Sequence, residues 1–236
     1  MSVTLPEAAP QVRDALARLH DVFAASEDVE SAVLYGSFVR GGFRSEASDI
    51  NLALAVRGEA LTKLVAPLRD AWRSARIDPW IARTSEVAGL ADAFATRVRD
   101  IQRCHHVLYG TNPWPALHVP PLALRLRLEQ ELRNHQMRLR HARVLGDATA
   151  QARQLYVTSG ALRNELSLVE ELAGGAAHEA IDSIAIAIAK RLDLARADVH
   201  PVLAYHGSPG APTDVMEQAA KLLERAVAFV DAMEVS

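Results

Sequence analysis

A glycine, a serine and two polar residues further along the chain have the types and spacing to hold phosphate and a metal ion. Gly36 and Ser37 directly follow a short apolar run at residues 31–35. Glycine lets the backbone approach a ligand closely, and the amides of a helix start form an anion site suited to phosphates. Asp49 lies twelve positions after Ser37, and Asn51 lies two positions further. Because side chains alternate along a strand, Asp49 and Asn51 should face one side and offer oxygen ligands to Mg²⁺.

Hydrophobic spacing in the first 112 residues predicts a region of mixed helix and strand. Apolar residues at helical spacing predict helices over about 6–25, 61–72 and 85–108. Short apolar or alternating runs predict strands over 31–35 and 50–56. A third short strand is predicted over 77–82, and Pro79 places it at a sheet edge or makes it irregular, because proline cannot donate to a neighbouring strand. We therefore expect an α+β domain with a small mixed sheet flanked by helices.

The second half of the chain is predicted to be helical. Prolines crowd residues 113–121, which we interpret as an extended linker. Helical stretches follow over about 121–145, 149–173, 176–192 and 213–233. Four helices with short turns favour an antiparallel bundle. The predicted domains are thus 1–112, a linker at 113–121, and an all-α bundle at 122–236 that would bind an acceptor or a partner.

Composition excludes several classes of protein. The 236 residues are 50% hydrophobic and 23% charged, which is unlike a disordered or collagen-like chain. A formal net charge of −3 gives no general attraction for nucleic acid, so any nucleotide site must be local. Cys104 is the single cysteine, which excludes an internal disulfide. We see no signal peptide and no apolar run of about 20 residues that could cross a membrane, and we expect a cytoplasmic protein.

The segment at 33–56 resembles the nucleotidyltransferase superfamily of the DNA polymerase β type. The resemblance is strongest to small bacterial members, including aminoglycoside nucleotidyltransferases and minimal antitoxin-type transferases. The family pattern is Gly-Ser, about a dozen residues, and then Asp-hydrophobic-Asp. The residues that match it here are Gly36, Ser37, Arg40, Gly41, Ser48, Asp49, Ile50 and Leu52. Asp78 lies where the family has a third carboxylate, on a later strand.

The resemblance implies a role for each of these residues. Gly36 and Ser37 would hold the β- and γ-phosphates of a nucleoside triphosphate, and Arg40 and Arg44 would add phosphate contacts. Asp49, Asn51 and Asp78 would bind Mg²⁺, and Asp78 would also act as general base. The implied reaction moves a nucleoside monophosphate to a hydroxyl of a small molecule or a protein. Because members of this family usually use ATP, the group transferred would be AMP. We expect the nucleotide and the acceptor to meet in a cleft between the two lobes.

Asn51 departs from the family pattern, which has a second aspartate at this position. An amide oxygen can ligate Mg²⁺, but it brings no negative charge. Two unit charges at about 4 Å interact by roughly 4 kcal/mol at an effective dielectric constant near 20, so the loss is substantial. We expect one weak metal site or none. A second hypothesis is therefore a catalytically lapsed relative that binds a nucleotide or a partner without transfer.

Each of these signals also has an ordinary structural explanation. Gly36 and Ser37 could form a plain turn, and Asp49 and Asp78 could be solvated carboxylates at strand ends. A third hypothesis for the chain is a structural bundle that forms a homodimer through an apolar helix face. The spacing of three isoleucines would place them on such a face: Ile181, Ile184 and Ile188. One predicted helix carries a stripe of arginines. The stripe could face an acidic ligand, or it could be a solvated face with salt bridges to Glu129. Its members are Arg125, Arg133, Arg140 and Arg143.

Overall fold

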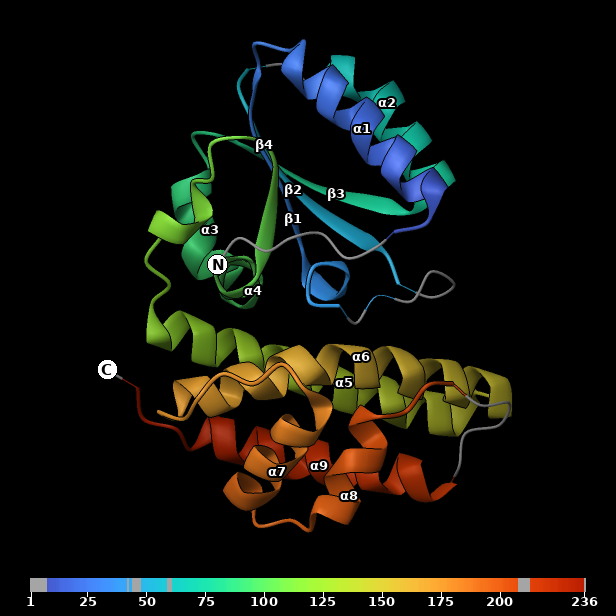
Figure 1. Ribbon diagram of the computed structural model, residues 1–236. Helices are drawn as coiled ribbons and strands as arrows, with labels where there is room; N and C mark the ends of the chain where they lie inside the picture. Colours follow the sequence, from blue (N-terminus) through green and yellow to red (C-terminus); the bar gives the residue numbers. More distant parts are fainter. Residues whose placement is uncertain (1–7, 42, 44–47, 59–60, 208–212, 236) are drawn as a thin grey trace. The chain divides into compact units, whose positions relative to one another are not determined.

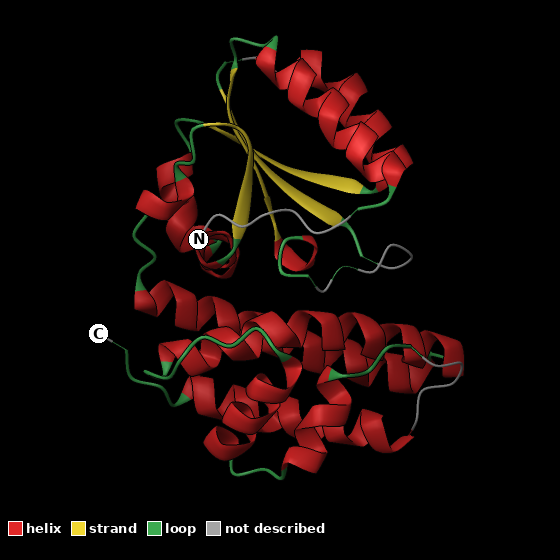
Figure 2. Ribbon diagram, in the orientation of Figure 1, coloured by secondary structure: helices red, strands yellow, loops and turns green. Residues whose placement is uncertain are grey.

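The computed structural model describes residues 8–41, 43, 48–58, 61–207 and 213–235. The chain divides into two compact units, Met1–Val119 and Pro120–Ser236. The first unit combines a sheet with helices, and the described part of the second is helical with connecting loops (Figures 1 and 2). The predicted α+β class, with a small mixed sheet followed by a helical region, is confirmed.

The first unit is built on a four-stranded sheet with the order β3-β2-β1-β4. Its strands are β1 Val29–Tyr35, β2 Ile50–Val56, β3 Ile77–Arg83 and β4 His105–Gly110. β1 runs antiparallel to both β2 and β4, whereas β2 and β3 are parallel. β3 lies at the edge of the sheet, as Pro79 predicts, because an edge strand needs backbone donors on one side only.

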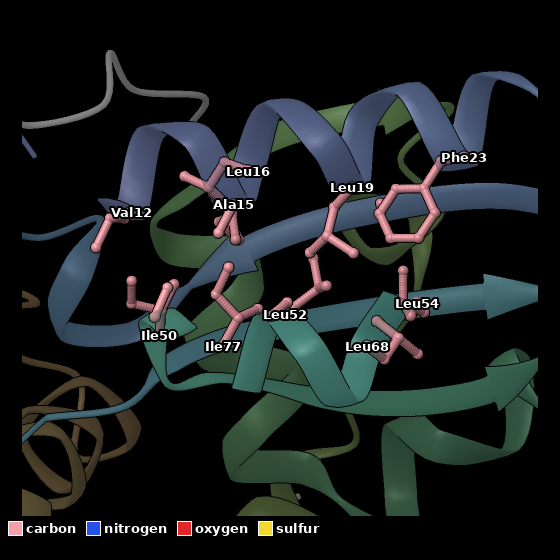
Figure 3. Packing of buried hydrophobic residues seen from close by; sticks show 14 of the residues in the cluster. Val12, Ala15, Leu16, Leu19, Phe23, Ile50, Leu52, Leu54, Leu68 and Ile77 are labelled. Carbon is pink, nitrogen blue, oxygen red and sulfur yellow. The ribbon is translucent and has the colours of Figure 1, made fainter. Parts of the chain in front are cut away.

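Helices α1 (Pro10–Ala24) and α2 (Leu61–Ala75) cover one face of this sheet (Figure 1). Leu19 and Phe23 of α1 pack with Leu52 and Leu54 of β2, and all four side chains are buried (Figure 3). Each fully buried side chain of this size contributes about 1.5–3 kcal/mol through removal of apolar surface from water. This core holds the ends of β1, β2 and β3 in a fixed register, on which the candidate site depends.

The opposite face of the sheet carries a smaller apolar cluster and, towards one end, polar residues. Val98 and Ile101 of α4 (Ala95–Arg103) pack there with Val33 of β1 and with Trp114. Trp114 belongs to a short 3₁₀ helix, Trp114–Ala116, and is completely buried. The first part of the proline-rich segment at 113–121 is therefore packed onto the sheet rather than extended, because burial of the indole outweighs the tendency of prolines to stay solvated.

The predicted long helix over 85–108 is wrong. The region forms a 3₁₀ turn, Val87–Gly89, then α3 (Leu90–Ala93), α4, and finally strand β4. Phe94 interrupts the helical backbone with φ −127° and ψ 44°. Helical spacing of apolar residues continued into β4, but backbone hydrogen bonds to β1 decide its conformation. A pairing between residues so distant in sequence is invisible to a local pattern.

The second unit contains α5 (Pro121–Leu145), α6 (Ala148–Leu172), α7 (Ile181–Leu192), α8 (Arg196–Leu203) and α9 (Thr213–Asp231). Helix α8 was not predicted, and α7 begins five residues later than expected. Asp193, with φ 52°, ends α7 and allows the chain to start α8 shortly afterwards. None of the helices in the described part of the chain is long and apolar enough to span a bilayer.

Two expectations for the helical unit can be compared with the contacts. Ile184 and Ile188 are buried within the single chain, so these two members of the isoleucine face are not exposed for dimerisation. In the arginine stripe, the Arg125 Nη1 lies 3.4 Å and the Arg133 Nε lies 2.8 Å from carboxylate oxygens of Glu129. The pairing through Glu129 is as expected, but Arg125 is not solvated: its side chain is 15% exposed and its Nη1 also donates to the carbonyl of Val230 on α9, at 3.0 Å.

Candidate active site

The turn after β1 is built around Gly36, which has φ 81°. Gly36 opens a 3₁₀ turn, Gly36–Phe38, and its carbonyl accepts hydrogen bonds from the amides of Val39 and Arg40, at 3.2 and 3.1 Å. A Cβ atom on Gly36 would lie 2.5 Å from Nδ2 of Asn51. A side chain here would be strained by the backbone conformation and would push against the Asn51 amide. The turn lies directly against the beginning of β2, with Ser37 half-buried beside it.

A row of three polar residues crosses the sheet next to this turn. Tyr35 of β1 is paired with Asn51 of β2, and Asn51 is paired in turn with Asp78 of β3. Residues directly opposite each other on neighbouring strands point to the same face of a sheet. The structure thus brings Gly36, Asn51 and Asp78 together, as the sequence predicts, and adds Tyr35, which the sequence analysis did not identify.

Asp49 lies immediately before β2 and is held by an arginine. Nε and Nη2 of Arg76 lie 2.9 and 2.8 Å from the Asp49 Oδ1 atom. Arg76 follows α2 and precedes β3, and it has a left-handed backbone with φ 53°. That conformation costs a residue with a Cβ roughly 1–2 kcal/mol. The carboxylate expected to bind a metal is therefore already engaged by a cation of the chain itself.

The electrostatic environment shifts the pKa values of two residues in the row. Desolvation and the neighbouring Asp49 carboxylate raise the pKa of Asp78, and the Arg97 guanidinium opposes the shift. Burial raises the pKa of Tyr35 to about 12, with a further contribution from the Asp100 and Asp78 carboxylates. Asp78 thus holds a proton more readily than an ordinary aspartate, whereas Tyr35 keeps its proton and can serve as a hydrogen-bond donor.

Arg97 of α4 is a positively charged neighbour that the sequence analysis missed. Its Cζ atom lies 4.9 Å from the ring centroid of Trp80, which follows Asp78 by two residues on β3. Trp80 stacks in turn on buried Trp114, with ring centroids 5.3 Å apart. A cation held over an indole is partly oriented before any ligand arrives. No signal in the sequence marks Arg97, because only the packing of α4 brings it to β3.

The two arginines expected to contact phosphate have different outcomes. Arg40 pairs with Asp100 of α4 through its Nη1 atom, and their side chains are 19% and 10% exposed. This nearly buried ion pair ties the segment after Gly36 to α4, an anchoring contact that the sequence analysis did not foresee, and the phosphate contact of Arg40 stays a prediction. Arg44 lies outside the described residues, so its predicted role stays a prediction.

The residues present do not fit the Mg²⁺ centre implied by the resemblance. Among the described residues, no group of three or more His, Cys, Asp or Glu side chains is arranged to hold a metal. Asn51 contributes no charge, and Asp49 is bound to Arg76. Divalent ions in such centres are usually shared between carboxylates. Asp78 is the remaining carboxylate of the expected set, and one carboxylate with an amide makes a poor magnesium site.

Comparison with known proteins identifies the fold. No protein-family model and no curated protein matches the sequence. Among solved structures, spectinomycin adenyltransferase AAD(9) from Enterococcus faecialis, determined with ATP and spectinomycin, has a TM-score of 0.57 and 12% identity; the match covers 93% of this chain and 99% of that one. A nucleotidyltransferase-like protein from Exiguobacterium sibiricum matches at a TM-score of 0.37 and 12% identity, over 91% and 74% of the two chains. The chain therefore adopts a nucleotidyltransferase fold, on the evidence of the first similarity.

Proposed function

We propose that this protein transfers AMP from ATP to a hydroxyl group of a small molecule, as a nucleotidyltransferase of the DNA polymerase β type. The observation that carries the proposal is the contact between the Gly36 turn and Asn51, with Asp78 next to Asn51 on the neighbouring strand. This arrangement puts a glycine turn, whose backbone a phosphate can approach closely, beside a carboxylate suited to proton transfer.

The proposed reaction uses residues of the first unit. The Gly36 and Ser37 turn would bind the β- and γ-phosphates of ATP. An acceptor oxygen would attack the α-phosphorus atom, the bond to the β-phosphate oxygen would break, and pyrophosphate would leave. Asp78 would accept the hydroxyl proton, for which its raised pKa is favourable because a base works best when its pKa approaches the working pH.

Positive charge near the phosphates would come from the chain. Arg97 and Arg76 lie beside Asp78 and Asp49 respectively, and both are at least partly exposed. Guanidinium groups form paired hydrogen bonds with phosphate oxygens and stabilise charge that builds up on a leaving pyrophosphate. No step is assigned to Mg²⁺, because Asn51 and the Asp49–Arg76 pair disfavour its site.

The acceptor is proposed to be a small molecule on the strength of the structural neighbour. The adenyltransferase with the same fold was determined with ATP and spectinomycin, a small-molecule acceptor. The helical unit is proposed to supply acceptor contacts. A hydroxyl of a protein remains the second acceptor class to include in an assay.

Asn51 favours a second candidate function, in which the protein binds nucleotide without transferring it. The two functions are separated by incubating the full chain with α-³²P-labelled ATP and spectinomycin or other hydroxyl-bearing acceptors, and measuring label transfer and pyrophosphate release. Transfer that is lost in Asp78→Asn supports the enzyme. ATP binding by calorimetry without any transfer supports the binding protein, and the absence of ATP binding contradicts both.

A further inference from the structure

Arg76 has a backbone conformation that residues with side chains rarely adopt. Its amide donates to the carbonyl of Trp72 at the end of α2, and its carbonyl accepts from the amide of Ile50 at the start of β2, both at 2.9 Å. Glycine is the usual residue where a helix ends in the left-handed conformation. Among the described residues other than glycine, only Arg76 and Asp193 have a positive φ. The strain at Arg76 makes the contacts of its side chain worth following.

The use that the structure shows is a contact with Asp49. Two nitrogen atoms of the guanidinium, Nε and Nη2, lie within 2.9 Å of one carboxylate oxygen, Oδ1. The side chains of Arg76 and Asp49 are 45% and 38% exposed, so ions and ligands in solution can reach the pair. Arg76 therefore holds the carboxylate that a metal would need, at a place where a metal could compete for it.

Among the described residues named for this site, the formal charges at the pair balance without a metal. Asp49 and Asp78 carry two formal negative charges, Asn51 carries none, and Arg76 and Arg97 carry two positive charges. An aspartate at position 51 would leave one negative charge uncompensated, whereas asparagine leaves none. A divalent cation at Asp49 would have to displace Arg76 and would be repelled by its charge.

We propose that the Arg76 guanidinium takes the place of a divalent metal at Asp49, so that this site binds nucleoside triphosphate without requiring a metal. The nucleotide part of this inference rests on the proposed function. The Asn51 substitution and the left-handed arginine are then two parts of one arrangement: the first removes a negative charge, and the second supplies a fixed positive charge beside Asp49.

Arg76→Gly tests the proposal, with Asp193→Gly as the matched control. Both substitutions place glycine at a left-handed position, but only the first removes a cation from the candidate site. Arg76→Asn is a second variant, because asparagine tolerates this conformation and keeps a polar side chain. Calorimetry on the full chain would measure Mg²⁺ binding alone, and ATP binding in EDTA and in Mg²⁺. Tryptophan fluorescence would verify that each variant is folded.

The expected results follow from the loss of one charge-assisted contact. Wild-type protein and Asp193→Gly should bind ATP equally well in EDTA and in Mg²⁺. Arg76→Gly and Arg76→Asn should lose about tenfold or more in ATP affinity in EDTA, regain it in Mg²⁺, and bind Mg²⁺ alone about tenfold more tightly than wild type.

The outcomes that overturn this proposal differ from those that overturn the proposed function. A wild-type protein that binds ATP only with Mg²⁺, or variants at position 76 whose Mg²⁺ affinity equals that of wild type, would overturn the role of Arg76 and leave nucleotide transfer standing. Failure of the wild type to bind ATP under either condition would overturn the proposed function. In that case a gain of Mg²⁺ affinity in both position-76 variants would still support Arg76 as the replacement for a metal.

Discussion

The side-chain amide of Asn51 lies against the backbone of Gly36, so closely that a Cβ atom on Gly36 would be 2.5 Å from Nδ2. This contact joins the turn after β1 to the beginning of β2 and leaves no room between them for a side chain. Asn51 thus has two relationships: it packs on the turn proposed to hold phosphate, and it lies beside the Asp78 carboxylate on β3. The predictions below follow from this contact, its neighbours and one buried pair in the helical unit.

Gly36→Ala should destabilise the first unit by about 2–4 kcal/mol, the sum of left-handed strain and overpacking against Asn51. Gly41→Ala is the matched control, because Gly41 has φ 82° but no atom of the described residues within 4 Å of its Cβ position. That variant should lose only the strain, about 1–2 kcal/mol. All three tryptophans of the chain, Trp72, Trp80 and Trp114, lie in the first unit, so tryptophan fluorescence in a urea titration reports on this unit. Equal losses in the two variants would show that Asn51 moves aside without cost.

Asn51→Asp should tighten Mg²⁺ binding by about tenfold or more, because the new carboxylate adds a charged oxygen ligand next to Asp78. Without metal the same variant should unfold at lower temperature, since the new carboxylate would repel those of Asp49 and Asp78, and Mg²⁺ should reverse the loss. Thermal unfolding in EDTA and in Mg²⁺ measures both effects. Asn134→Asp on α5 makes the same charge change in the other unit and should show no response to Mg²⁺. An unchanged Mg²⁺ affinity in the position-51 variant would remove this residue from any metal site.

Asp78 should make the first unit less stable as pH rises. Its pKa is raised in the folded protein, so the folded state keeps a proton that the unfolded state releases near pH 4. Stability therefore falls as pH rises from about 4 through the raised folded pKa, and then levels off. In Asp78→Asn this fall should be absent, so the stability of the variant relative to wild type should increase across that range. Urea unfolding followed by tryptophan fluorescence at several pH values would measure the free energy of unfolding of both proteins. A difference between them that does not change with pH would argue against a perturbed carboxyl at this position.

Arg40→Ala should destabilise the first unit strongly, because it leaves the Asp100 carboxylate without its cation in a nearly buried position. Removal of one partner of a buried pair costs about 3–5 kcal/mol, and the 19% exposure of Arg40 places the expected loss at the lower end. Arg57→Ala removes an arginine from an exposed pair with Glu30 and should cost much less. ATP affinity should also fall in Arg40→Ala, since the Gly36 turn loses its tie to α4. Equal stability of the two variants in urea would show that the Arg40–Asp100 pair anchors nothing.

A buried pair in the helical unit gives a prediction of a different kind. Nε2 of His135 on α5 lies 3.0 Å from Oε1 of Glu165 on α6, and each side chain is 8% exposed. Nδ1 of His135 and Oε2 of Glu165 are buried, and neither has a hydrogen-bond partner within the part of the chain that the structure describes. Glu165→Leu alone should destabilise the helical unit by about 3–5 kcal/mol, whereas the double variant with His135→Leu should recover most of the loss.

Far-UV circular dichroism would follow the unfolding of the helices in these variants, and unchanged tryptophan fluorescence would show that the first unit is intact. A double variant no more stable than Glu165→Leu would mean that the pair itself, rather than the burial of one unpaired group, supports the packing of α5 and α6.

Local patterns were sufficient for most of the elements and for part of the site. Alternation along β2 and the glycine after β1 depend on neighbouring residues, so they can be recognised without knowledge of the rest of the chain. Strand β4 and helix α8 could not be recognised in this way. The first pairs with β1 through hydrogen bonds, and the second follows a left-handed turn at Asp193.

The sequence by itself determined which residues lie at the ends of β1 and β2, because apolar alternation and a required glycine are properties of a few consecutive positions. Only the tertiary structure decided that Arg76 holds Asp49, that Arg40 binds Asp100, and that Arg97 lies over Trp80. Each of these contacts joins residues at least 17 positions apart. Their charges interact through distances in space, which the order of residues in a chain does not specify.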